Sequence, residues 1–121
     1  MKIAGIGLRK AATIESLRSA LTKVDSTGVS AIATPIDKAD FSAIQTLAHE
    51  LGLNIIGVES GDLIAQTTAT QSERVQNLRG TGSVAEAAAL AGAGKNARLL
   101  IPRVVSDDRM ATCAIAEGNE N

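Results

Sequence analysis

Apolar residues follow two different patterns along the first half of the chain. Continuous apolar runs at residues 3–8, 29–34 and 54–58 predict three short, buried strands. Between these runs, apolar residues recur every three or four positions, which predicts helices over residues 13–25 and 40–51. Because helices separate the strands along the chain, we expect parallel strands joined by crossover connections.

Polar and glycine residues mark the expected ends of these two helices. Thr13 and Asp40 precede the first apolar residue of each helix, where a side-chain oxygen caps the free backbone amides. Gly28 and Gly52 follow the last apolar residues, and glycine there allows the chain to leave the helix. Both helices are therefore predicted to be complete, separate elements.

The second half of the chain holds a polar stretch, an alanine-rich helix and a final pair of strands. We expect a helical turn at residues 59–65, an exposed loop at 66–72, a short helix at 72–78, an alanine-rich helix from 83 to about 91, and strands at 99–105 and 110–116. The last two strands are joined by a connection of hairpin length. The whole pattern predicts one three-layer α/β/α domain over residues 1–121, with a mixed sheet of about five strands and a C-terminal β-hairpin.

The helix start within residues 80–90 has the most distinctive local pattern. Ser83 and Glu86 form a Ser-x-x-Glu pattern, in which each side chain satisfies a free amide at a helix start. Glu86 is the only charged residue between Gly80 and Gly94, so this helix is expected to be largely buried. Its first turn would present free amides and a partial positive charge, which suits an anion. Equally, the pattern can serve only to start the helix.

Composition excludes several classes of function. The net charge is −1 and Phe41 is the only aromatic residue, so neither a basic field nor a stacking platform for nucleic acid is present. One cysteine, Cys113, and one histidine, His49, cannot form a disulfide or the familiar zinc sites, and we expect no metal. No stretch approaches the roughly 20 apolar residues that span a bilayer. We therefore expect a cytoplasmic protein that binds neither membrane nor nucleic acid.

Two glycine-containing segments approach known nucleotide-binding motifs without matching them. Lys10 stands where a dinucleotide fingerprint beginning at Gly5 needs its third glycine. Near Lys95, a Walker loop would need glycine at Ala89 and serine or threonine at Asn96. We therefore predict no nucleotide cofactor, and no other cofactor is indicated.

Basic residues follow the first two predicted strands. Arg9 and Lys10 come after the first strand and Lys38 after the second, and open α/β sheets bind ligands where their strands end. If the helix start at Ser83 shares that edge, amides and cations converge on a site for carboxylates or phosphates. The alternative is that each cation is a solvated surface charge. The residues expected to bind the ligand are Gly5, Gly7, Arg9, Lys10, Thr34, Lys38, Gly82 and Ser83.

No set of nucleophile, base and orienting acid is evident from spacing. His49 lies beside the apolar stripe of its helix and is expected to be exposed rather than catalytic. Cys113 lies in a predicted strand and is expected to be a small core residue. Glu86 and Asp37 remain the candidates for acid or base chemistry, and each could instead be structural.

Five segments stand out along the chain: Gly5-Ile6-Gly7-Leu8-Arg9-Lys10-Ala11, Ala33-Thr34 with Lys38 and Asp40, Ser83 to Leu90, Leu99-Leu100-Ile101-Pro102-Arg103 and Ala111-Thr112-Cys113-Ala114-Ile115-Ala116. In this order they resemble the family of cobalamin-biosynthesis domains called CobE, or the carboxy-terminal domain of CbiG. Leu8, Ala11 and Arg103 stand where that family frequently has Cys, Gly and Lys.

The resemblance implies an α/β domain that takes part in corrin-ring assembly. Its expected ligand is a precorrin or corrinoid, whose acetate and propionate groups suit the basic loops. It also implies two alternatives: a hydrolase of the cobalt-precorrin-5A lactone type, acting alone or with a partner, and a domain that docks a precorrin methyltransferase. Other enzymes of the cobalamin pathway are thus possible partners.

Overall fold

The computed structural model describes residues 1–66, 68, 71 and 82–118. Its elements, in chain order, are β1 (Lys2–Leu8), α1 (Ile14–Thr22), β2 (Val29–Pro35), the 3-10 turn η1 (Ile36–Lys38), α2 (Ser42–Leu51), β3 (Asn54–Val58), α3 (Ser60–Ile64), α5 (Val84–Ala93), β4 (Arg98–Val105) and β5 (Ala111–Glu117). The expected helix at residues 72–78 lies outside the described residues, as does Gly80.

Five strands form one mixed sheet in the order β3-β2-β1-β5-β4. β1, β2 and β3 pair in parallel, as the helical crossovers predict. β5 is antiparallel to both β1 and β4, so the C-terminal hairpin adds β5 beside β1 and places β4 at the edge. The predicted fold class is therefore confirmed.

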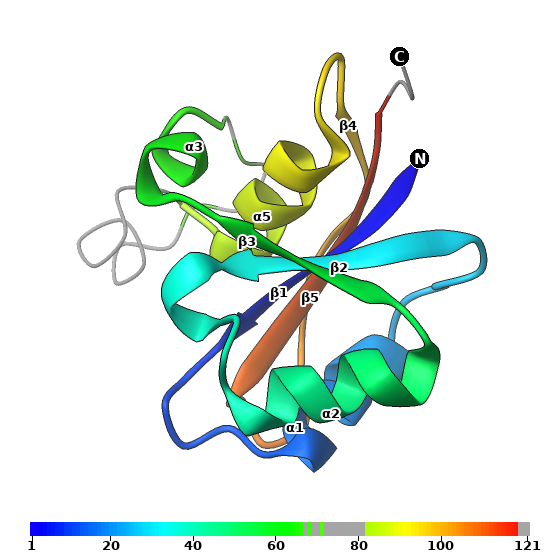
Figure 1. Ribbon diagram of the computed structural model, residues 1–121, viewed down its shortest axis with the longest axis vertical. Helices are drawn as coiled ribbons and strands as arrows, with labels where there is room; N and C mark the ends of the chain where they lie inside the picture. Colours follow the sequence, from blue (N-terminus) through cyan, green and yellow to red (C-terminus); the bar gives the residue numbers. More distant parts are fainter. Residues whose placement is uncertain (67, 69–70, 72–81, 119–121) are drawn as a thin grey trace.

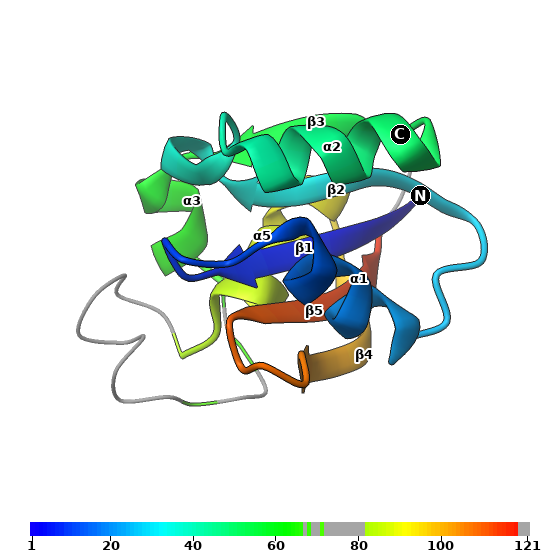
Figure 2. The same ribbon diagram turned by 90° about the horizontal axis from the view of Figure 1, so that it is seen from below.

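Helices cover both faces of the sheet. In Figure 1, α3 and α5 lie above the sheet and α1 and α2 lie below it, and Figure 2 shows the same layers from below. Side chains of β1 alternate between these layers: Ile3 packs with the core of α5, whereas Ala4 and Ile6 pack with the core of α1 and α2. The sheet thus separates two apolar cores, one on each face.

β1 has glycines where α5 crosses it. A Cβ atom added at Gly5 would lie 2.0 Å from the Ala85 carbonyl oxygen and 2.5 Å from the Ala89 amide nitrogen. One added at Gly7 would lie 2.6 Å from Thr112 Oγ1. The absent side chains therefore let the alanine-rich helix approach the strand backbone closely.

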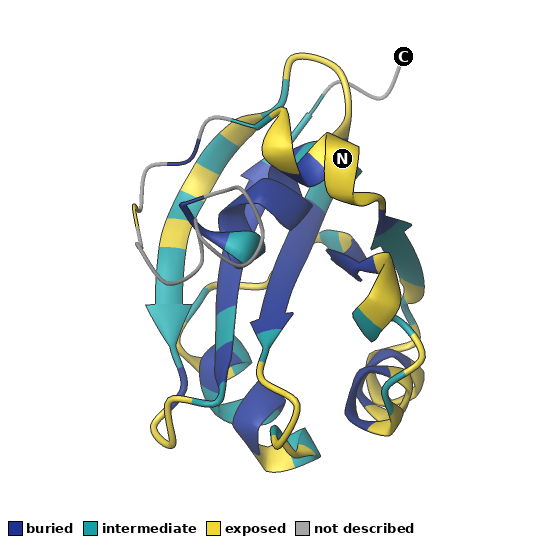
Figure 3. Ribbon diagram, turned by 90° about the vertical axis from the view of Figure 1, so that its left-hand side faces the viewer, coloured by how far each residue is buried: buried dark blue, intermediate teal, exposed yellow. Residues whose placement is uncertain are grey.

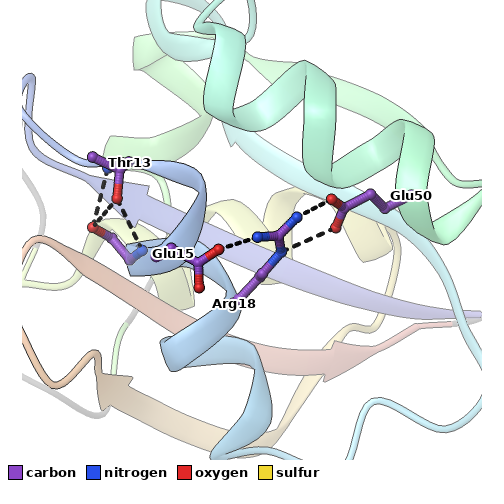
Figure 4. Close-up of polar contacts among 5 residues, drawn as sticks. Thr13, Glu15, Arg18 and Glu50 are labelled. Carbon is purple, nitrogen blue, oxygen red and sulfur yellow. Dashed lines mark hydrogen bonds and ion pairs between the residues drawn. The ribbon is translucent and has the colours of Figure 1, made fainter.

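The first two helices are joined by polar contacts. Thr13 caps α1 as expected, because its hydroxyl accepts a hydrogen bond from the Ser16 amide (Figure 4). In return, the Ser16 hydroxyl accepts a hydrogen bond from the Thr13 amide. Arg18 of α1 binds both Glu15 and Glu50, and Glu50 belongs to α2 (Figure 4). The guanidinium lowers the pKa of the Glu50 carboxyl below its ordinary value. All three charged groups are partly exposed, so this bridge is worth little more than the ordinary surface ion pair.

Two expected helix boundaries are wrong. Asp40 does not cap α2, because η1 occupies the start of the preceding loop and places Phe41 at the N-cap without a side-chain hydrogen bond. α1 ends at Thr22 with Lys23 as its C-cap, and Gly28 instead turns the chain into β2 with a φ of +80°. Gly52 does end α2, in the left-handed conformation that favours glycine.

Candidate functional site

All strands except β5 run in one direction, so β1, β2, β3 and β4 end on the same side of the sheet. We call this side, with the residues directly following each strand, the carboxyl edge. Figure 3 views the molecule from the side where β1, β2 and β3 end, with exposed loops around a buried strand and helix. Ligands of open α/β sheets bind on this side.

The loop after β1 carries two exposed cations on an anchored backbone. The Arg9 amide donates a hydrogen bond to the Met110 carbonyl at 2.8 Å, and the Arg9 carbonyl accepts one from Ala12 at 3.0 Å. These bonds tie the loop to the β4–β5 hairpin and close a turn. Arg9 and Lys10 are both exposed. The backbone is therefore held while the charged side chains stay accessible to solvent.

The loop after β2 holds the other predicted residues. Thr34 is fully buried, and its hydroxyl donates to the Ile6 carbonyl at 2.9 Å, which joins β2 to β1 at the end of their pairing. Asp37 lies exposed in η1. The Lys38 ammonium lies 4.5 Å from the centre of the Phe41 ring, a cation–π contact. Thr34 thus has a structural task, and its contact with a ligand remains a prediction.

The start of α5 lies against the end of β1. Gly82 and Ser83 are buried, and a Cβ atom at Gly7 would lie 3.5 Å from the Ala85 amide nitrogen. The helix N-terminus and the basic loop after β1 are therefore neighbours at the carboxyl edge. Both glycines predicted to contact a ligand in β1 lie within the strand rather than in the loop. Their backbones face α5, so a role in ligand binding remains a prediction.

The expected capping box at α5 is present in one half. Ser83 Oγ accepts a hydrogen bond from the Glu86 amide at 3.3 Å. The Glu86 carboxylate accepts a hydrogen bond from the Arg103 amide of β4 at 2.8 Å, and Glu86 is fully buried. The carboxylate therefore joins α5 to the edge strand, which sequence spacing alone does not reveal.

Several cations at or near the carboxyl edge are without a carboxylate partner within the described residues. Across residues 1–66, 68, 71 and 82–118, the side chains of Arg9, Lys10, Arg103 and Arg109 take part in no ion pair. Arg18, Lys23 and Arg98 each hold a carboxylate, whereas Lys2 and Lys95, at the opposite edge, form no ion pair within the same residues. Asp37, Asp40, Asp107 and Asp108 lie in the same strand-end loops, so this edge offers cationic side chains to a ligand without being basic overall.

A hydrogen-bonded cluster fixes the hairpin loop to α1. Asp108 accepts hydrogen bonds from Ser16 Oγ at 2.5 Å and Ser106 Oγ at 2.6 Å, and Ser106 Oγ accepts one from the Ala111 amide at 3.0 Å. Sequence reasoning missed these residues, because the contact from Ser16 to Asp108 crosses most of the chain. The Ser-Asp-Asp-Arg composition of the loop indicated a turn, and nothing more.

This cluster predicts a measurable pH dependence. Hydrogen bonds from Ser106 and Ser16 lower the pKa of Asp108 below its ordinary value. The ionised carboxylate therefore adds stability above about pH 4, the unfolded pKa, and this stability is lost as the pH falls through the folded pKa. We expect Asp108→Asn to lower the melting temperature by a few degrees at pH 7. The difference from wild type should shrink below about pH 4.

Thermal unfolding followed by circular dichroism between pH 3 and 7 measures this difference. Asp40→Asn is the matched control, because the exposed Asp40 carboxylate makes no hydrogen bond within the described part of the chain. If the difference in melting temperature between Asp108→Asn and wild type stays constant down to pH 3, the Asp108 carboxylate does not stabilise the fold through its charge.

The remaining candidates lie away from any reactive arrangement. Cys113 is fully buried in β5, and burial raises the pKa of its thiol to about 12, so it is a core residue as expected. His49 is exposed on α2, as expected. Over the described ranges, no group of three or more histidine, cysteine or acidic side chains could hold a metal ion. Within those same ranges no helix combines the length and apolar character needed to cross a membrane.

Comparison with known proteins places this fold in one family. The sequence matches the family model described as cobalamin synthesis G C-terminus over residues 2–116. A crystal structure of CobE, a protein from the cobalamin (vitamin B12) biosynthetic pathway, is 30% identical with a TM-score of 0.84, and the match covers 96% of this chain and 89% of that chain. The cobalamin biosynthesis protein ChiG from Agrobacterium tumefaciens is 34% identical with a TM-score of 0.73, and the match covers 99% and 100% of the two chains.

A putative cobalamin biosynthesis protein G homolog from Sulfolobus solfataricus shares the fold, with a TM-score of 0.71 at 20% identity. That match covers 98% of this chain and 37% of the homolog. No curated protein matches the chain. The family match and the two structures at 30% identity or above agree with the architecture described here. The chain therefore belongs to the cobalamin synthesis G C-terminus family of cobalamin-biosynthesis proteins.

Proposed function

We propose that this protein binds a precorrin or corrinoid intermediate of cobalamin biosynthesis at its carboxyl edge. The observation that carries the proposal is that two exposed cations and the half-buried Lys38 follow neighbouring parallel strands beside the start of α5, and none of the three forms an ion pair within the described residues. Arg9 and Lys10 stand on an anchored loop, and Lys38 follows the neighbouring strand. Macrocycles of this pathway carry acetate and propionate groups, which form charge-assisted hydrogen bonds with such cations.

Apolar side chains at the same edge support a macrocyclic ligand over a small anion. Ile36 directly follows β2 and is 47% exposed, and Ile64, which ends the short helix α3 after β3, is 56% exposed. A tetrapyrrole presents an apolar ring as well as a charged rim, so it can bury apolar surface while its carboxylates meet the cations. A small inorganic anion gains nothing from these two side chains.

Catalysis on the ring is the alternative, with Glu86 or Asp37 as acid or base. Glu86 is fully buried and its carboxylate holds the Arg103 amide, an arrangement that favours a structural task. Asp37 is exposed on η1. Binding without a chemical step of its own, or binding in support of another pathway enzyme such as a precorrin methyltransferase, therefore fits these residues better.

A spectroscopic titration tests the proposal. The probe is uroporphyrin III, a tetrapyrrole with acetate and propionate groups on every ring, and its visible absorption is followed as protein is added. We expect a saturable band shift with a Kd below about 1 mM. Cobalamin, whose ring carries amides in place of these carboxylates, is the matched ligand control and should bind more weakly. The absence of any shift near millimolar concentrations would overturn the proposal.

A further inference from the structure

The edge strand β4 has an irregular backbone beside α5. Between Ile101 and Val104 the strand advances by three residues while its partner β5 advances by two, from Ile115 to Cys113. One extra residue is therefore accommodated on β4, which is the definition of a β-bulge. Bulges bend a strand and redirect its side chains, and they are common next to functional sites.

Glu86 supplies the hydrogen bond that this bulge needs. Its carboxylate accepts the Arg103 amide at 2.8 Å, and the carboxylate is completely buried. A buried carboxylate is costly unless its oxygens receive hydrogen bonds, and a bulge leaves a backbone amide without its ladder partner. The Arg103 amide therefore finds its acceptor in Glu86, and the Glu86 carboxylate gains a hydrogen bond to one of its oxygens. The bond fixes the backbone of Arg103 beside the first turn of α5.

The side chain of Arg103 is left available at this fixed position. Arg103 is partly exposed and, over the described residues, makes no ion pair. Arg98, on the same strand, instead binds Glu117 at 3.2 Å. A cation on a backbone held by a buried hydrogen bond loses less conformational freedom on binding than one on a mobile loop. Arg103 is thus better prepared for binding than an ordinary surface arginine.

We infer that Arg103 is a further carboxylate-binding residue of the site, and that Glu86 is the positioning residue that holds it there. This inference rests on the proposed function, because it assigns another of the ligand's carboxylates to Arg103. It also gives Glu86 a task other than acid–base chemistry. The carboxylate acts as a hydrogen-bond acceptor for the bulge, and the guanidinium of Arg103 can bind a carboxylate through two parallel hydrogen bonds.

Affinity for uroporphyrin III, measured by the absorption titration, tests both roles. We expect Arg103→Gln to weaken binding about tenfold, which corresponds to about 1.4 kcal/mol. Arg98→Gln is the matched control, with the same charge change on the same strand, and should stay within about twofold. Glu86→Gln keeps an oxygen acceptor for the Arg103 amide and should bind like wild type. Glu86→Leu removes the acceptor and should weaken binding as Arg103→Gln does.

Each alternative outcome has a distinct meaning. If wild type binds and Arg103→Gln binds equally well, the inference fails while the proposed function stands. If Glu86→Gln remains folded by circular dichroism yet loses affinity, Glu86 acts through its charge and its positioning role is overturned. If Glu86→Leu does not fold, the Arg103→Gln and Glu86→Gln measurements still decide the matter.

A second probe separates this inference from the proposed function. Tricarballylate, a small tricarboxylate without a ring, is added to ¹⁵N-labelled wild-type protein, and the arginine Nε–H signals are followed by NMR. We expect the Arg103 signal, assigned by its loss in Arg103→Gln, to shift while that of Arg98 does not. If uroporphyrin III does not bind but this shift is present, the proposed function fails and the carboxylate site at Arg103 stands. If neither occurs, both are overturned.

Discussion

Replacing Gly5 by alanine is expected to unfold the protein or to lower its melting temperature by at least about 12 °C. The added methyl group would lie 2.0 Å from the Ala85 carbonyl oxygen and 2.5 Å from the Ala89 amide nitrogen. These are backbone atoms of a buried helix, so no rotation of a side chain relieves the contact. Overpacking of this kind costs about 3 kcal/mol or more, and each kcal/mol lowers the melting temperature of a domain of this size by about 4 °C.

Two other glycines provide graded controls for this measurement. Gly7→Ala meets chiefly Thr112 Oγ1, at 2.6 Å, and that side chain can move, so a smaller loss of about 1–2 kcal/mol is expected. Gly61→Ala in α3 has no atom within 4 Å and should stabilise the helix by up to about 1 kcal/mol. Thermal unfolding of the three variants measures their melting temperatures, which should rise in the order Gly5→Ala, Gly7→Ala, Gly61→Ala. A Gly5→Ala protein as stable as wild type would contradict the packing described here.

The same variants separate packing from ligand binding at β1. Gly5 and Gly7 were predicted to contact a ligand because they precede a basic loop, yet the backbone of β1 is covered by α5 at these positions. If Gly7→Ala folds and binds uroporphyrin III as wild type does, the glycines serve packing alone. If it folds with a normal melting temperature but loses affinity, they also serve the site.

Local sequence patterns were sufficient for most of the elements and for the mixed character of the sheet, but not for the order of its strands. Short apolar runs located β2 and β3, and the hairpin-length loop before Ala111 indicated the β4–β5 hairpin, whose strand β5 pairs with the central strand β1. Thr13 and Gly52 were found because capping depends on residues three or four positions away. Asp40 was wrongly predicted as the N-cap of α2. The 3-10 turn η1 precedes it and moves the N-cap to Phe41, and residue propensity does not distinguish a 3-10 turn from the loop that was expected.

The candidate site was less predictable because its contacts are distant in sequence. Ser16 meets Asp108 across ninety-two positions, and Glu86 meets the Arg103 amide across seventeen. The Ser-x-x-Glu spacing correctly located the start of α5 but assigned the Glu86 carboxylate to its own helix. The parallel order of β1 and β2 follows from the crossovers, so the convergence of Arg9 and Lys38 on one edge could be expected. The bulge in β4 could not be predicted from the sequence.

Removing the three predicted cations together should reduce affinity for uroporphyrin III by on the order of a hundredfold. Exposed charge contacts contribute up to about 1 kcal/mol each, and Arg9→Gln, Lys10→Gln and Lys38→Gln would remove three of them. The triple variant Lys2→Gln, Lys95→Gln and Arg98→Gln is the matched control. It changes the net charge equally, from −1 to −4 because three positive charges are lost from −1, but its residues lie at the opposite edge of the sheet.

Salt dependence distinguishes direct contact from a general field effect in this comparison. Charge contacts between exposed groups weaken as ionic strength rises, because the Debye length falls from about 10 Å at 0.1 M to about 3 Å at 1 M salt. Wild type and the control variant should therefore lose affinity with added salt, whereas the carboxyl-edge variant, already without these contacts, should change little. If both triple variants lose affinity equally, the ligand responds to net charge alone. The assignment of Arg9, Lys10 and Lys38 to the binding site would then be wrong.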